Sequence, residues 1–140
     1  MASAETLQFA MGRVGRQLRA AFKSDPAAIG VLYQLSRSGP VRISALANAL
    51  ALDVSTTSRH VRGLETDELV ERQADPEDGR ATLLHITEAG RQFLADAIAE
   101  RSAVLRAATA GWDEHDLTAL NHYLARLADD LANLTGETLA

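Results

Sequence analysis

Three arginines stand in settings where a guanidinium group could bind a nucleic acid. Arg59 and Arg62 lie in the run VSTTSRHVRGLET, and Arg80 ends the acidic stretch DPEDGR. A guanidinium presents a planar fork of N–H donors that matches phosphate oxygens and the acceptors on the edge of guanine. Any one of these arginines alone is typical of a solvated surface charge, so the elements that carry them decide the interpretation.

The run from 54 to 66 has two chemically different faces at the 100° per residue of a helix. Short hydroxyl side chains in its first turn would let the helix end approach a phosphate, and arginines further along would reach base edges. The competing interpretation is that the two arginines are solvated surface charges, with or without pairing to neighbours such as Glu65. The face expected to point inward holds Val54, Thr57, Val61 and Leu64. The outward face holds Ser55, Thr56, Arg59, Arg62 and Thr66, with His60 on the flank.

Two further helices are predicted before this run. The first begins at Pro26 after the cap Asp25 and stops near Gly39, and a short extended piece follows around Val41. The second spans roughly 44 to 50, where Ser44 caps or nearly caps it. Since Asp53 can cap the run from 54 to 66, two short helices joined so tightly predict a helix-turn-helix.

The acidic stretch lies between two short segments, LVERQ and ATLLHI, that alternate enough to pair as strands. The intervening DPEDG is rich in turn-forming residues. A helix-turn-helix followed directly by a two-stranded hairpin is a winged helix, so the fold class predicted is mainly α with a small β-hairpin wing.

The run from roughly Val41 to Phe93 resembles the winged-helix region of the MarR (multiple antibiotic resistance regulator) family, in particular the part ELVERQADPEDGRATLLHITEAGRQFL. The family's wing carries a D-x-R motif, matched by Asp78, Gly79 and Arg80. Its next helix opens with a threonine-glutamate-x-glycine motif, matched by Thr87, Glu88 and Gly90. The resemblance implies that Arg80 enters the DNA minor groove while Asp78 orients it, and that the helix from 54 to 66 occupies the major groove. Ser44 is expected to contact the DNA backbone.

One residue departs from the family pattern. Glu68 stands where the family usually places a glycine to end the recognition helix. We expect either a strained positive φ at Glu68 or a different turn.

The terminal segments predict long amphipathic helices that join two copies of the chain. In the first, an apolar stripe opposes basic residues, and lying on a membrane surface is the alternative to packing. A helix with apolar positions from Phe93 to Ala108 ends at Gly111, and Asp113 with Asp116 forms a capping pattern for the last helix. Leucines at steps of three and four then favour a partner helix over packing within one chain. The residues expected in the dimer interface are Leu7, Met11, Val14, Leu117, Leu120, Leu124, Leu127 and Leu131, and Leu134 continues the last stripe.

Composition excludes some chemistry. There is no cysteine, so disulfides, thiolate metal sites and thiol redox chemistry are excluded. The net charge is −5, and 36–91 holds seven basic and nine acidic residues, so bulk charge does not indicate a nucleic-acid binder. The sequence has no apolar segment typical of a secretion signal or a membrane helix, and a cytoplasmic, nucleoid-associated protein is expected.

Enzymatic and metal-binding interpretations find only fragments. No phosphate-binding glycine loop, HExxH or GxSxG motif occurs, and we expect no catalysis and no cofactor. His115 and His122 share a helical face, but a metal between them would need further ligands such as Asp113 or Asp116, so we expect no metal site.

We therefore expect a homodimeric regulator of transcription that binds double-stranded DNA at an inverted repeat. A repressor released by a small, aromatic or phenolic effector is the form that the resemblance implies; its binding residues are not identifiable by pattern. The alternative is a winged-helix protein-interaction module without DNA binding, which the acidic balance favours. Three regions of one continuous domain are expected: 1–35 and 92–140 for dimerisation, and 36–91 for DNA.

Overall fold

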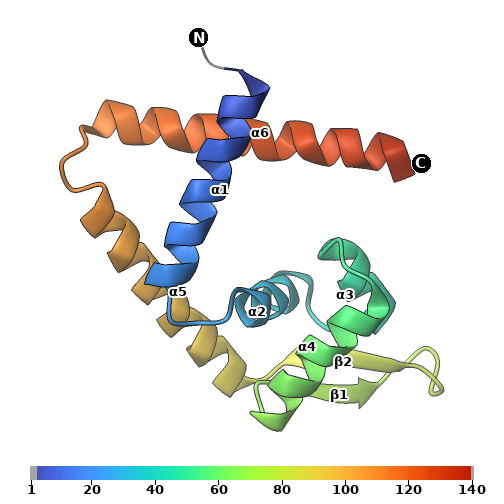
Figure 1. The fold of residues 1–140 in the computed structure, drawn as a ribbon. Coiled ribbons are helices and arrows are strands. Elements are labelled where there is room, and N and C mark those ends of the chain that lie inside the picture. Colours follow the sequence, from blue (N-terminus) through green and yellow to red (C-terminus); the bar gives the residue numbers. More distant parts are fainter. Residues whose placement is uncertain (1–2, 140) are drawn as a thin grey trace. The chain divides into compact units, whose positions relative to one another are not determined.

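The structure is a computed structural model that describes residues 3–139 (Figure 1). It is mainly helical with one two-stranded hairpin, which confirms the predicted fold class. The elements are α1 (Ala4–Ala21), α2 (Pro26–Ser38), α3 (Ile43–Ala49), α4 (Val54–Thr66), β1 (Val70–Ala74), β2 (Thr82–Ile86), α5 (Glu88–Ala108) and α6 (Glu114–Leu139).

The chain divides into two compact units, Met1–Val104 and Leu105–Ala140, and their boundary falls inside α5. The first unit contains the helix-turn-helix and the hairpin, and the second contains α6. The functional division into 1–35, 36–91 and 92–140 remains a prediction.

Local signals explain the start and end of α2. The Asp25 side chain accepts a hydrogen bond from Ala27 N at 3.0 Å, and Pro26 occupies the first helical position. At the other end Gly39 has a φ of 72°, a conformation open to glycine without strain, and its N–H donates to the Leu35 carbonyl at 3.1 Å. Both predicted ends of this helix are confirmed.

The beginning of α3 differs from the prediction. Arg42, not Ser44, is the N-cap of α3, and no side chain bonds the free amides there. Ser44 already lies inside the helix, one residue beyond its first, so the expected cap is wrong. The turn after α3 holds Ala51 at a φ of 55°, where the Leu52 N–H donates to Ala47 O at 3.0 Å.

The wing is an antiparallel hairpin in which Val70 pairs with Ile86 and Ala74 with Thr82. The extended piece at Val41 joins this hairpin, because Val41 and Leu84 exchange two backbone hydrogen bonds of 3.1 and 2.7 Å. The segment just before α3 is therefore attached to β2.

A single apolar core supports these elements. It is built from one face of α2, α3 and α4, the inner face of the hairpin and the beginning of α5. The buried members are Ile29, Val31, Leu32, Leu35, Leu46, Val61, Leu64, Leu69, Val70, Leu84, Ile86, Leu94 and Ala97. The buried face of α4 is thereby fixed, and its opposite face is left for other contacts.

The junction of the wing with α5 is closely packed. Glu68 has a φ of 60°, so the expected positive φ is present. The Thr87 hydroxyl donates to Glu68 O at 2.8 Å and accepts from Gly90 N at 3.0 Å, so Thr87 caps α5. A Cβ on Gly90 would overlap the Leu69 carbonyl oxygen. Only glycine therefore fits at position 90. The other end of α5 lies at Ala108 rather than at the predicted Gly111.

The terminal helices leave their apolar stripes exposed in the single chain. No residue of α1 is buried, and Leu7, Met11 and Val14 are about half exposed. On α6, which Asp113 caps by accepting from Asp116 N at 2.8 Å, Leu124 is 52% exposed and Leu127 partly buried. None of the helices in residues 3–139 has the length and apolarity that crossing a membrane requires.

Candidate nucleic-acid interface

The helix α4 is fixed at its first turn by its own cap. The Asp53 carboxylate accepts from Thr56 N at 2.7 Å, and Thr57 Oγ1 donates to the Asp53 carbonyl at 2.9 Å. The Thr56 amide, followed by its hydroxyl, lowers the pKa of Asp53 below its usual range. The predicted cap is confirmed, and one amide expected to attract a phosphate is already bonded to a carboxylate.

The predicted inner face of α4 is confirmed for three residues and wrong for the fourth. Thr57, Val61 and Leu64 are buried. Val54 is 47% exposed, because it stands at the first position of the helix, before Val61 and Leu64, which α4 contributes to the core. Val54 therefore belongs to the exposed end of α4.

The predicted outer face is available for binding. Ser55, Arg59, Arg62 and Thr66 are exposed, and Thr56 is partly buried. The alternative in which Glu65 neutralises the arginines of this helix is not observed, because Glu65 accepts three hydrogen bonds from Arg72 of β1 at 2.9 and 3.0 Å. Within residues 3–139, neither Arg59 nor Arg62 forms an ion pair with a carboxylate.

His60, expected on the flank of α4, is less exposed than the arginines of the outer face. It is partly buried at a cavity of about 310 Å³ whose wall includes Asp25 of the α2 cap, Asp67 and Phe93. Arg59 reaches the same cavity and also lies 3.4 Å from the Thr56 hydroxyl.

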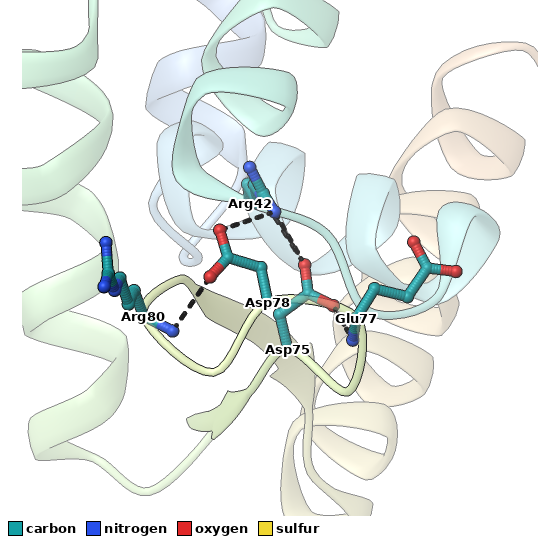
Figure 2. A network of polar contacts seen from close by, with 5 residues as sticks. All are labelled: Arg42, Asp75, Glu77, Asp78 and Arg80. Carbon is teal, nitrogen blue, oxygen red and sulfur yellow. Dashed lines mark hydrogen bonds and ion pairs between the residues drawn. The ribbon is translucent and has the colours of Figure 1, made fainter.

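The tip of the wing is held by carboxylates and one arginine from outside the hairpin (Figure 2). Arg42 donates to Asp75 Oδ2 through Nη2 at 2.9 Å and through Nε at 3.3 Å. Its Nη2 also lies 3.8 Å from Asp78 Oδ2. The Glu77 amide and then the Arg42 guanidinium hold the pKa of Asp75 below its usual range, and the carboxylate raises the pKa of Arg42.

Asp78 is hydrogen-bonded to the main chain of Arg80. Its Oδ1 accepts from the backbone N of Arg80 at 3.1 Å, whereas Figure 2 shows the Arg80 side chain extending away from both aspartates. In the described part of the chain the Arg80 guanidinium forms no ion pair. A Cβ added to Gly79 would meet no described atom within 4 Å, so this side of the turn is open.

Sequence reasoning missed two residues that support this surface, Arg42 and Arg72. Arg42 pairs with Asp75 at the wing tip, and Arg72 pairs with Glu65 on α4. No periodic pattern connects Arg42 with Asp75, which lies 33 residues later. The only signal for Arg42 in the sequence was that a basic residue follows the extended piece at Val41.

A second cavity, of about 280 Å³, lies in the first unit between α1, α2 and α5. The Arg101 guanidinium stacks over the Phe22 ring with 4.7 Å between its carbon and the ring centroid. Its Nε and Nη2 are buried and make no hydrogen bond with described residues. The remaining wall is formed by Gly15, Leu18, Arg19 and Pro26.

No group of three or more histidine, aspartate or glutamate side chains in residues 3–139 is arranged to hold a metal ion. His115 and His122 line a shallow hollow on α6 with Tyr123.

Comparison with known proteins agrees with this geometry. Residues 26–82 match the model of the MarR family. The HTH-type transcriptional regulator YxaD of Bacillus subtilis (strain 168) is 47% identical over 64 residues. That match covers 46% of this chain and only 45% of the length of YxaD.

Solved structures extend the likeness in fold beyond the matched residues. A probable transcriptional regulator from Pseudomonas aeruginosa is 28% identical with a TM-score of 0.75, over 86% of this chain and 96% of that one. Bordetella bronchiseptica BpsR, whose DNA binding is regulated by 6-hydroxynicotinic acid, is 20% identical with a TM-score of 0.74, over 92% and 97%. The winged helix-turn-helix of this chain thus matches the MarR family model over residues 26–82, and the fold along most of the chain is similar to that of a solved probable transcriptional regulator.

Proposed function

We propose that this chain is a sequence-specific transcriptional regulator that binds double-stranded DNA. One observation carries the proposal: Arg59, Arg62 and Arg80 are exposed and form no ion pair in the described chain, while neighbouring Arg42 and Arg72 are paired. A guanidinium that is not neutralised by its own protein is available to phosphates and base edges.

The helix α4 is proposed to enter the major groove. Arg59 and Arg62 would reach base edges, where a bidentate contact to guanine is the commonest specific one. Ser55 and Thr56 would approach a phosphate at the first turn, and Ser44 on α3 would contact the backbone. His60, on the flank of α4, would contact DNA at the edge of this surface.

The wing is proposed to reach the adjacent minor groove. A narrow minor groove concentrates negative potential and attracts an arginine inserted into it. Arg80 would be that arginine, Asp78 would set its main chain, and Gly79 would leave room for the sugar-phosphate backbone. The acidic residues around it weaken non-specific attraction, so the contact depends on local placement.

A homodimer on an inverted repeat completes the proposal. The exposed stripes on α1 and α6 are supporting evidence, since leucines at steps of three and four favour a partner helix. Two recognition helices related by a two-fold axis would read half-sites about 10 base pairs apart. Doubling the contacts would compensate for the weak positive charge of each copy.

The effector is proposed to be a small organic anion in the cavity between α1, α2 and α5. Buried N–H donors without an acceptor are costly, and the Arg101 guanidinium has two of them beside an aromatic ring. A carboxylate on an aromatic or phenolic molecule would accept from Arg101 while its ring packs on the apolar wall. Release of repression requires that this ligand bind the DNA-free arrangement more tightly.

DNA binding is tested by titrating a labelled duplex from the gene's own upstream intergenic region at two salt concentrations, with unrelated DNA as competitor. Binding that weakens as salt increases, prefers the upstream duplex and weakens further in Arg80→Ala supports the proposal. Binding that ignores salt, or is equal for both duplexes, contradicts it.

Effector binding is tested by thermal shift with benzoate and its neutral analogue benzamide. Benzoate is expected to raise the unfolding temperature and benzamide is not, and Arg101→Ala should abolish the difference. An equal response to both compounds would contradict the anion site.

The alternative function is a protein-interaction module that has lost DNA binding. The net charge of −5 favours this alternative. Such a module gives no reason to leave Arg59, Arg62 and Arg80 all exposed and unpaired. The same titration separates the two functions, because a module would not distinguish the duplexes.

A further inference from the structure

Arg42 occupies a position that connects the body of the winged helix to the tip of the wing. It is the N-cap of α3 and follows Val41, which is itself bonded to β2. Its guanidinium makes a two-donor contact with Asp75, whose side chain is only 11% exposed. An ion pair with two donors on a largely covered carboxylate is better defined than a typical surface pair.

From Arg42 a continuous chain of polar contacts leads to Arg80. Asp78 lies between them and uses a different oxygen for each: Oδ2 faces Arg42 Nη2 at 3.8 Å, and Oδ1 accepts from Arg80 N at 3.1 Å (Figure 2). The backbone nitrogen of Arg80 determines where its side chain begins. The position of Arg42 therefore bears on the position of the proposed minor-groove arginine.

The wing tip has little other support. The remaining polar contacts of 75–80 stay within the hairpin: Asp75 N to Ala81 O, Ala81 N to Asp78 O, and Glu77 N to Asp75 Oδ1, at 2.9 to 3.0 Å. Among the described residues, Arg42 is the one side chain outside the hairpin with a polar contact to this loop.

The loop at the tip of the wing is acidic. The loop 75–80 holds three carboxylates and one arginine, a balance of −2, which repels a phosphate backbone. Arg42 lies against two of those carboxylates and reduces the local balance to −1. Without it, Asp75 and Asp78 would repel each other and the DNA, and both would be free to attract Arg80.

We propose that Arg42 is a positioning residue for DNA binding, which holds Asp75 and Asp78 so that Arg80 extends from the wing into the minor groove. The inference rests on the proposed DNA-binding function. It assigns to Arg42 an effect that passes through Arg80, in contrast to a direct contact of Arg42 with phosphate.

A double-mutant cycle on the full-length protein distinguishes these two roles. Arg42→Ala is expected to weaken binding of the upstream duplex by roughly threefold to tenfold in the natural background. In the Arg80→Ala background the same change is expected to have an effect of less than about twofold, because the group that it positions is gone. Arg42→Lys, which keeps one charged donor but loses the fork, should fall between Arg42→Ala and the natural protein.

Arg72→Ala is the matched control, since it removes an arginine–carboxylate pair at the base of the same hairpin. Its effect on binding should be the same with and without Arg80. Equal weakening by Arg42→Ala in both backgrounds, together with a salt dependence reduced by about one phosphate contact, would show a direct DNA contact and overturn the inference.

A measurement on the free protein tests the positioning without DNA. The amide of Arg80, bonded to Asp78, should exchange its hydrogen faster in Arg42→Ala and at the natural rate in Arg72→Ala. An unchanged rate in Arg42→Ala would overturn the inference. If the natural protein binds no duplex selectively, the proposed function fails, while the exchange rates still decide whether Arg42 holds the wing.

Discussion

Arg72 on β1 and Glu65 on α4 form a two-donor ion pair, with the Nη2 and Nε atoms of Arg72 2.9 and 3.0 Å from the Glu65 carboxylate oxygens. This pair joins α4 to strand β1 of the wing. Glu65 lies within one helical turn of Arg62, but its carboxylate is bonded to Arg72. The arginines of α4 consequently keep their charge for an external partner.

Arg59→Ala should lower affinity for the preferred duplex by about 1–3 kcal/mol and relax the preference at one base pair. The reason is that an arginine on a base edge discriminates among bases, whereas an arginine on a phosphate does not. Competition titrations over single-base variants of the duplex measure both effects. Arg13→Ala on the exposed side of α1 is the charge-matched control, and an equal loss in both variants would argue against base reading by Arg59.

Gly90→Ala should destabilise the fold by roughly 1–3 kcal/mol, because the new Cβ would overlap Leu69 O and lie 2.7 Å from Ile86 Cγ1. The control is Gly63→Ala in α4, where a Cβ meets nothing within 4 Å. A helix-interior alanine should there stabilise by about 0.5–1 kcal/mol. Urea unfolding measures both, and a Gly90→Ala variant as stable as the natural protein would contradict the close packing.

Glu68→Gly should stabilise the fold by up to about 1 kcal/mol, since a side chain at a φ of 60° carries strain that glycine lacks. Asp67→Gly, at a φ of −85°, is the neighbouring control and should give no gain. Thermal unfolding of the two variants compares them directly. A Glu68→Gly variant less stable than Asp67→Gly would show that Glu68 contributes contacts that outweigh its strain.

Asp53→Ala should lower the unfolding temperature at pH 7, because it removes the acceptor of the Thr56 amide. Since folding lowers the pKa of Asp53, its contribution is fully present above the ordinary aspartate pKa of about 3.9 and is lost as pH falls through the lower folded pKa. The difference from the natural protein should therefore shrink in acid. Ser44→Ala, which removes no cap bond, should change little at any pH.

Leu124→Asp should convert the proposed dimer to monomers, since a carboxylate in an apolar interface is costly to bury. Leu124 is 52% exposed in the single chain, so the folded monomer should tolerate the change. Sedimentation at several protein concentrations measures the association. His122→Asp places a carboxylate on the opposite face of α6 and should remain dimeric; a dimeric Leu124→Asp would assign the interface elsewhere.

Rules that act within a few residues were sufficient to predict the helices and strands and the buried face of α4. Asp25, Pro26 and Gly39 mark the ends of α2, and Asp53 and Thr87 cap α4 and α5, because caps and positive-φ glycines act within a few residues. The spacing of Thr57, Val61 and Leu64 places the arginines of α4 outward for the same local reason. Ser44 and Val54 were misjudged because each stands at a helix end, where one residue of offset changes the surroundings.

Which charges remain free is decided only by the tertiary structure. Glu65 pairs with Arg72 rather than with its helical neighbours, and Asp75 with Arg42, across 7 and 33 residues of sequence. The cavity of Arg101 and Phe22 joins side chains from opposite ends of the first unit. A sequence pattern shows the period of an element, whereas an ion pair or a cavity depends on how the elements pack. That packing leaves Arg59, Arg62 and Arg80 without an ion pair in residues 3–139 of a chain whose net charge is −5.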